Sequence, residues 1–237
     1  MKKLIMILAC LILSAAGLAG CANNAQSFTE ESFAADANEI KGIVLDVRER
    51  LIEIAPSEDD QVHIEYYSSS KEYYDLSVSQ DNILTMRAVQ NKSWTDYIGV
   101  KAPAQNRKIF LRVPDGLLAS LTVSTTKENI LIEALSVSEN LSLYTNGGNI
   151  TFERLNAGNG IELQAKNGDI SGCVAGSYED YSISCSFKKG KSNLPEYKES
   201  GVKTLKVENN NGDINIQFRS VYKELHADHK TGAADNK

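Results

Sequence analysis

The sequence lacks the short motifs that mark the common catalytic sites. It contains no Gly-x-Ser-x-Gly nucleophile elbow, no His-Glu-x-x-His zinc motif and no phosphate-binding glycine loop. Its acidic residues are scattered through predicted turns, whereas a glycosidase needs two carboxyl groups facing one groove. We therefore predict a protein that is not an enzyme and uses no cofactor. A carbohydrate-active β-helix enzyme is the alternative, and it would release reducing ends or unsaturated products from wall glycans.

An excess of basic charge is also lacking. The chain has 25 Lys and Arg residues against 31 Asp and Glu residues. Loss of Lys2 and Lys3 with a signal peptide would leave 23 basic residues and a net charge of −8. A nucleic-acid partner needs a basic footprint, and anionic lipid attracts polybasic segments. We expect neither kind of electrostatic partner.

No apolar run is long enough to span a membrane, but the N-terminus carries an export signal. Two lysines precede the apolar run Leu4–Leu13, which is too short for a spanning helix. The sequence Leu-Ala-Gly-Cys then ends at Cys21 and resembles a bacterial lipobox. This resemblance implies a signal peptide over residues 1–20, lipidation of Cys21 and a location on the extracytoplasmic face of the cell membrane. The alternative is an ordinary secretory signal followed by an incidental cysteine.

Composition divides the rest of the chain into three parts. Residues 21–38 are mostly small and polar, which predicts a lipidated tether. Residues 39–222 read as strand after strand, without sustained helical periodicity. Residues 223–237 have little to bury and predict a disordered tail.

A repeat of 20 residues organises the second half of the chain. Copies begin at Leu121, Leu141 and Ile161, a weaker copy begins at Tyr181, and a clear one follows at Leu205. Each copy has two runs in which apolar and polar residues alternate, and this period of two indicates half-buried strands. Glycine with Asn or Asp separates the runs, as in turns. A fixed period of this kind is typical of stacked units that share a core.

Two all-β folds fit this pattern. Asn-Gly between alternating strands is a hairpin signal and fits an antiparallel β-meander sandwich. The pattern favours a β-solenoid, a β-helix-like stack of two-strand coils with a more sandwich-like N-terminal half, because a polar column and an aliphatic column recur one coil apart. These columns are Asn129, Asn149, Asp169 and Asp213, each followed by Ile130, Ile150, Ile170 or Ile214.

Few residues are candidates for a site. Cys173 and Cys185 are an even pair in an exported chain, so a disulfide is expected, and two buried reduced thiols are the alternative. Trp94 and Tyr97 lie in the irregular stretch 89–107 and are candidates for binding, although aromatics more often serve strand packing.

We predict no metal site. Turn chemistry accounts for the Asn-Gly-Asp sequences without calcium, because only Asp169 and Asp213 are acidic and the calcium β-roll repeats every nine residues or so. His226, Asp228 and His229 fall in the predicted tail, where the further ligands and folded surroundings of a zinc site are lacking.

The order of these segments resembles a known bacterial family. GIVLDV and ERLIEIAPSEDDQVHIEY are followed by YDLSVSQDNILTMR, KIFLRVP and the repeated TNGGNI, KNGDI and NNGDI elements. The set resembles the bacterial "putative adhesin" β-strand-repeat domain, a relative of head-type autotransporter-adhesin domains. The Lys188-Lys189-Gly190 sequence of the fourth copy departs from the pattern and puts continuous stacking there in doubt.

The resemblance implies a surface-exposed all-β protein that is often lipid-anchored. We expect a binding surface on the solenoid, adhesive or regulatory, whose partner is an envelope protein or a cell-wall glycan. A structural accessory of an envelope-stress sensing system is a further alternative.

Overall fold

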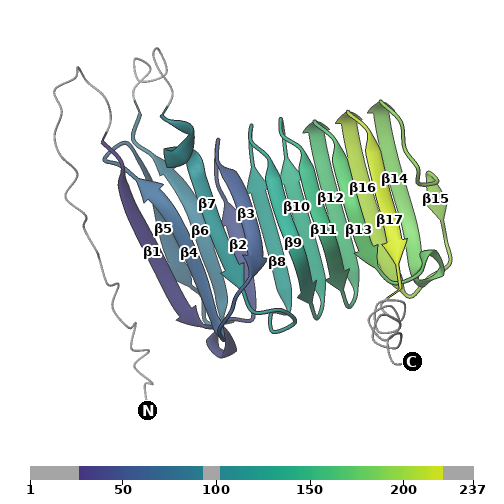
Figure 1. The fold of residues 1–237 in the computed structure, drawn as a ribbon, viewed down its shortest axis with the longest axis horizontal. Helices are drawn as coiled ribbons and strands as arrows, with labels where there is room; N and C mark the ends of the chain where they lie inside the picture. The colour runs from purple at the N-terminus through teal and green to yellow at the C-terminus, as the bar shows by residue number, and fades with distance from the viewer. Residues whose placement is uncertain (1–26, 93–101, 221–237) are drawn as a thin grey trace, which may run out of the picture.

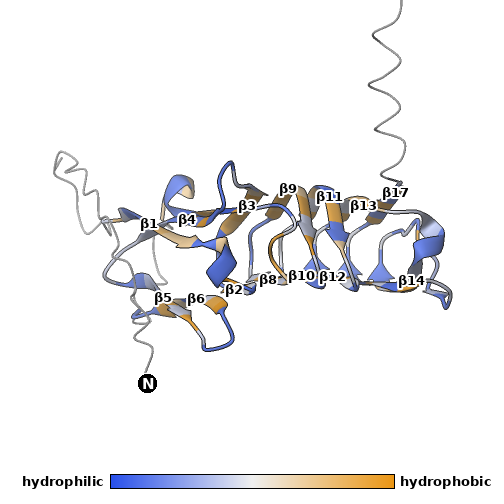
Figure 2. Cartoon of the chain, turned by 90° about the horizontal axis from the view of Figure 1, so that it is seen from below, coloured by the Kyte–Doolittle hydropathy of each residue, from blue (hydrophilic) through white to orange (hydrophobic). Residues whose placement is uncertain are grey.

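The chain folds into two facing β-sheets that run the length of an elongated molecule (Figures 1 and 2). A computed structural model describes residues 27–92 and 102–220. One sheet has eight strands, in the spatial order β1 (Thr29–Asp36), β4 (Gln61–Ser68), β7 (Lys108–Val113), β3 (Leu51–Pro56), β9 (Ile130–Val137), β11 (Ile150–Ala157), β13 (Ile170–Ala175) and β17 (Ile214–Arg219).

The second sheet has nine strands. Their spatial order is β15 (Tyr197–Lys198), β14 (Tyr181–Lys189), β16 (Lys203–Asn211), β12 (Gly160–Asn167), β10 (Asn140–Thr145), β8 (Ser120–Thr125), β2 (Gly42–Asp46), β6 (Ile83–Gln90) and β5 (Glu72–Val78). Short 3-10 turns lie at η1 (Ala37–Glu39), η3 (Ala104–Arg107) and η4 (Tyr178–Asp180). No helix within residues 27–92 and 102–220 is long and apolar enough to cross a membrane.

The repeats stack as parallel strands in register. In one sheet Leu121, Leu141 and Ile161 are direct neighbours on β8, β10 and β12. In the other, Ile130, Ile150 and Ile170 are neighbours on β9, β11 and β13, and these aliphatic side chains lie in the shared core. Each coil buries its apolar residues only because the next coil covers them. The solenoid prediction is confirmed, and the meander is wrong for the repeats.

The polar column at the turns works differently from a ladder of stacked amides. The backbone N–H groups of Asn149, Asp169 and Asp213 each donate to the side-chain Oδ1 of the column residue in the neighbouring coil, at 2.8 Å. Only one side-chain oxygen is required at each step. Asn and Asp are therefore interchangeable in this column, which explains why the sequence mixes them.

The last two repeats are stacked out of chain order. The copy that begins at Leu205 pairs directly with the copy at Ile161, so β16 lies between β12 and β14, and β17 lies on β13. The weaker copy at Tyr181 forms β14, which is outside that coil and is bordered by the two-residue strand β15. The doubt about continuous stacking at Lys188-Lys189-Gly190 is thus resolved: this copy is an end layer.

The N-terminal end combines coils with antiparallel strands. The pairs β2–β3 and β6–β7 continue the parallel stack, with Ile43 beside Leu121 and Ile52 beside Ile130. Beyond them, β4 pairs antiparallel with β7, β5 with β6, and β1 with β4. These antiparallel pairs are the sandwich-like part of the fold.

The tether predicted to extend to residue 38 is too long. Residues Thr29–Asp36 form β1, which pairs along its whole length with β4. The strand lies at a sheet edge, where Phe33 and Ala35 are only partly buried. An edge strand needs few large apolar residues, so its composition resembles that of a linker.

Candidate functional site

Several predicted site residues lie outside the residues that the structure describes. These are Cys21, Trp94 and Tyr97; His226, Asp228 and His229, where no zinc site is predicted, also lie outside them. Within the two described stretches, no three or more His, Cys, Asp or Glu side chains are gathered so that they could hold a metal ion.

The predicted disulfide is absent from the structure. Cys173 and Cys185 are both buried thiols that form no disulfide. They lie on strands of different sheets, Cys173 on β13 and Cys185 on β14. Cys185 Sγ is 3.4 Å from Ser192 Oγ, and burial raises the pKa of its thiol. The even number of cysteines in a chain predicted to be exported was therefore a misleading signal, because both side chains serve as small core residues.

Both thiols are expected to resist modification in the folded protein. A chain with Cys10→Ser and Cys21→Ser should react with almost no maleimide under native conditions, because both thiols are buried and burial also raises the pKa of Cys185, so that little thiolate is available. In denaturant without reductant, mass spectrometry should then find both thiols labelled. An unlabelled pair that becomes reactive only after reduction would show that a bridge forms.

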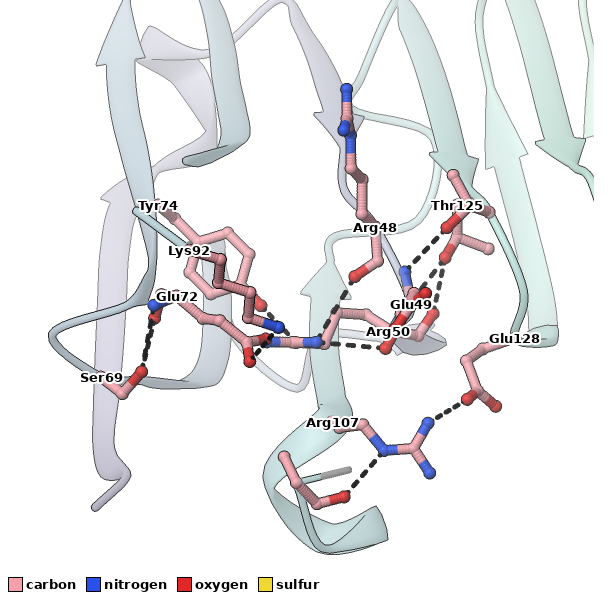
Figure 3. Close-up of polar contacts among 12 residues, drawn as sticks. Arg48, Glu49, Arg50, Ser69, Glu72, Tyr74, Lys92, Arg107, Thr125 and Glu128 are labelled. Carbon is pink, nitrogen blue, oxygen red and sulfur yellow. Dashed lines mark hydrogen bonds and ion pairs between the residues drawn. The ribbon is translucent and has the colours of Figure 1, made fainter. Parts of the chain in front are cut away.

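A buried polar cluster lies at the N-terminal end of the fold (Figure 3). Arg50, in the connection from β2 to β3, is 3% exposed and contacts the carboxylate of Glu72 at 2.6 Å. The other oxygen of Glu72 contacts Lys92 Nζ at 2.6 Å. Arg50 Nε also donates to the Tyr74 hydroxyl at 2.6 Å, and its carbonyl accepts from Thr125 on β8 at 2.9 Å. The cluster joins β5, the end of β6 and the first repeat.

The electrostatics of this cluster favour charged side chains. Burial alone would raise the pKa of Glu72, but hydrogen bonds from Lys92 and Arg50 outweigh it, so the pKa lies below its ordinary value. Burial raises the pKa of the Tyr74 phenol, which therefore stays protonated. A carboxylate that is held by two cations offers no free acid or base. We interpret the cluster as structural.

The outward face of the eight-stranded sheet has a different character. One row of outward side chains crosses four neighbouring strands in register: Phe110 on β7, Glu53 on β3, Leu131 on β9 and Thr151 on β11. Phe110 and Leu131 are half-buried apolar residues at positions where further coils place Ser171 and Asn215. Two large apolar side chains thus lie on the outside of the solenoid.

This row forms the floor of a shallow hollow of about 330 Å³. Its wall includes three carboxylates, those of Glu53, Glu133 and Glu153. Glu53 contacts Lys108 Nζ at 2.5 Å, whereas Glu133 and Glu153 are exposed to solvent. Three of the acidic residues that are scattered through the sequence therefore lie around one hollow. Glu133 and Glu153 therefore lack the burial that raises the pKa of a glycosidase's general acid.

The sequence contained a signal for this hollow. On β9 the buried residues Ile132 and Leu135 are three positions apart, and on β11 so are Phe152 and Leu155. Strict alternation would place buried residues two apart, so one additional residue must point outward in each strand. Glu133 and Glu153 are the first residues of these outward stretches. The register between β9 and β11 pairs the residues before and after them but gives neither a partner.

On the outward face of the nine-stranded sheet, charged side chains contact one another. Lys206 contacts Glu162 at 2.8 Å and Glu208 at 2.9 Å, and these hydrogen bonds raise its pKa. Tyr144 donates to Glu162 at 2.7 Å. A smaller hollow of about 230 Å³ lies beside them, with Ser142 on its wall. Its charged groups already have partners, so we regard the other face as the candidate site.

The geometry defines a class of protein: a two-sheet β-solenoid that has, among its described residues, a shallow hollow on an outer face. Residues 40–235 match the Toastrack DUF4097 domain, and the chain belongs to this family. None of the curated proteins matches the chain.

One solved structure of low sequence identity shares the fold. A "putative cell adhesion protein" from Clostridium sporogenes is 13% identical, with 81% of this chain and 100% of that chain covered at a TM-score of 0.54. A "putative adhesin" from Bacteroides fragilis is 15% identical over 80% and 97% of the two chains, at a TM-score of 0.38. The Clostridium sporogenes structure agrees with the predicted all-β fold, while the relation to autotransporter domains stays a prediction.

Proposed function

We propose that this protein is a lipid-anchored component of the cell envelope that binds an extracytoplasmic partner through its solenoid and catalyses no reaction. The observation that carries the proposal is the hollow over Phe110 and Leu131, because apolar side chains on the outside of a regular polar stack are typical of binding surfaces. The fold shared with a protein named for cell adhesion also supports this function.

The corrected position of β1 limits how far the anchored domain can lie from the membrane. Only Ala22–Phe28 separates Cys21 from the first strand. Seven residues, fully extended, reach roughly 25 Å. Since β1 lies at one end of the solenoid (Figure 1), lipidation of Cys21 would hold that end near the membrane and direct the β14–β15 end away from it.

The anchor is tested by lipid labelling. The wild-type chain should incorporate radioactive palmitate and fractionate with membranes, because lipidation at Cys21 supplies more than one acyl chain and two are needed for stable attachment. Cys21→Ala should lose the label and lose membrane retention. If Cys21→Ala is labelled as strongly as the wild type, the anchor is assigned wrongly.

Binding is tested by crosslinking in intact cells. A photo-reactive side chain at Leu131 on the proposed face should give a discrete adduct, and the same group at Ser142 on the opposite face should not. Mass spectrometry of the adduct would show whether it contains a protein or a wall glycan. Surface-displayed protein that gives no adduct from either position would contradict the binding function. Release of reducing ends from wall glycans would contradict the non-catalytic part.

A further inference from the structure

The hollow has an apolar floor whose aromatic ring is already covered on one side. The Arg112 guanidinium lies over the Phe110 ring, 4.4 Å from its centre, and contacts Glu65 at 2.8 Å. Sugar recognition by an aromatic residue uses a free ring face, and here that face is shared with a cation. Leu131, two strands away, is the other apolar part of the floor. The floor therefore suits an aliphatic chain better than a pyranose ring.

The charged side chains on the two sides of the hollow differ in whether they are paired. Lys108 and Arg112 flank Phe110 on β7 and contact Glu53 and Glu65. On the other side, Glu133 and Glu153 occupy corresponding positions one coil apart and are exposed. The charged groups that remain available to a ligand are thus the carboxylates of Glu133 and Glu153. They lie beside Leu131 on β9 and Thr151 on β11.

We infer that this hollow binds an extended protein segment that carries lysine or arginine. The aliphatic part of such a side chain would lie on Leu131 and the edge of Phe110, and its charged end would lie between Glu133 and Glu153. Lys and Arg bury their methylene groups on apolar surface while the charge stays in water. The predicted net charge of −8 for the mature chain would favour the approach of a basic partner. This inference rests on the proposed function and names the partner class of the same surface.

The test measures binding of a fluorescein-labelled peptide of alternating glycine and lysine by fluorescence anisotropy. The full chain is held in vesicles of zwitterionic phosphatidylcholine, and empty vesicles give the background. We expect saturable binding that weakens as salt is added, and no binding of the matched glycine and glutamate peptide. The double variant Glu133→Gln with Glu153→Gln should raise the Kd about tenfold. Leu131→Ser should raise it about fivefold through the loss of apolar contact.

A matched variant separates local from general charge effects. Glu139→Gln with Glu199→Gln removes the same two charges at exposed positions outside the hollow. Its Kd should stay within about twofold of the wild type. Equal weakening by the two double variants, wild-type affinity of the Glu133 and Glu153 variant, or equal binding of the glutamate peptide would each overturn the inference. Adducts that persist from position 131 would then leave the proposed function in place with another partner class.

Discussion

Gly168→Ala is expected to lower the free energy of unfolding by about 3–5 kcal/mol, because strain and steric overlap act together at this turn. Gly168 has a φ of +149°, a backbone conformation that residues with a side chain rarely adopt. A Cβ atom built there would lie 2.1 Å from the carbonyl oxygen of Gly148 in the neighbouring coil. That oxygen belongs to the backbone of an adjacent turn, so relief requires the coils to separate. Urea unfolding followed by circular dichroism measures the change.

Gly147→Ala is the matched control in the same set of turns. Atoms near a Cβ at this position start at 3.5 Å, which is ordinary van der Waals contact, and its φ is not in the left-handed region. We expect a change within about 0.5–1 kcal/mol. If Gly168→Ala and Gly147→Ala unfold at the same urea concentration, the close approach of the turns does not limit stability.

Glu72→Ala is expected to cost about 3–5 kcal/mol of stability, the effect of removing one partner from a buried ionic cluster. Arg50 and Lys92 would both lose their carboxylate contact, and Arg50 is almost fully buried. Glu162→Ala is the comparison on the exposed face, where Lys206 keeps its contact with Glu208. There we expect about 0–1 kcal/mol. Chemical unfolding of both variants measures the difference, and equal losses would show that burial of the cluster does not matter.

The same carboxylate should make stability depend on pH. The folded-state pKa of Glu72 lies below its ordinary value of 4.5. Its contribution is therefore complete above that ordinary value and is lost as the pH falls through the lower folded-state pKa. Glu72→Gln should remove this part of the acid dependence while the wild type keeps it. Unfolding curves across the acidic range test the difference, and parallel pH profiles of the two proteins would contradict it.

The repeats were predictable because their side-chain pattern is local. Strands β8 to β13 follow from the alternation around Leu121, Ile130 and their copies, and the column of Asn129 and Asn149 correctly indicated stacking. The order of the coils was not predictable. Ile161 could pair with Tyr181 or with Leu205, since both copies present apolar residues at the same spacing. Only the fit between complete layers decides which one is the neighbour.

The candidate site was less predictable, because it joins residues that are far apart in the sequence. Phe110, Leu131 and Thr151 share a row only because β7, β3, β9 and β11 are adjacent in the sheet. The contact between Arg50 and Glu72 likewise depends on how the antiparallel end strands are placed. The small and polar composition of Thr29–Asp36 gave no sign of an edge strand. The cysteine count suggested a disulfide between Cys173 and Cys185, but these residues lie on opposite sheets and form none.

The exchanged order of β14 and β16 places one of the last described strands of the chain inside the stack. While the polypeptide is still being made, β14 has no strand of the stack to pair with, because its neighbour β16 is made of residues that come later in the chain. The far end is complete only when β16 is inserted between β12 and β14, while β17 adds to β13 at the edge of the other sheet. Loss of this last segment would therefore open a gap inside the stack, with one loose layer beyond it, and would do more than shorten the rod.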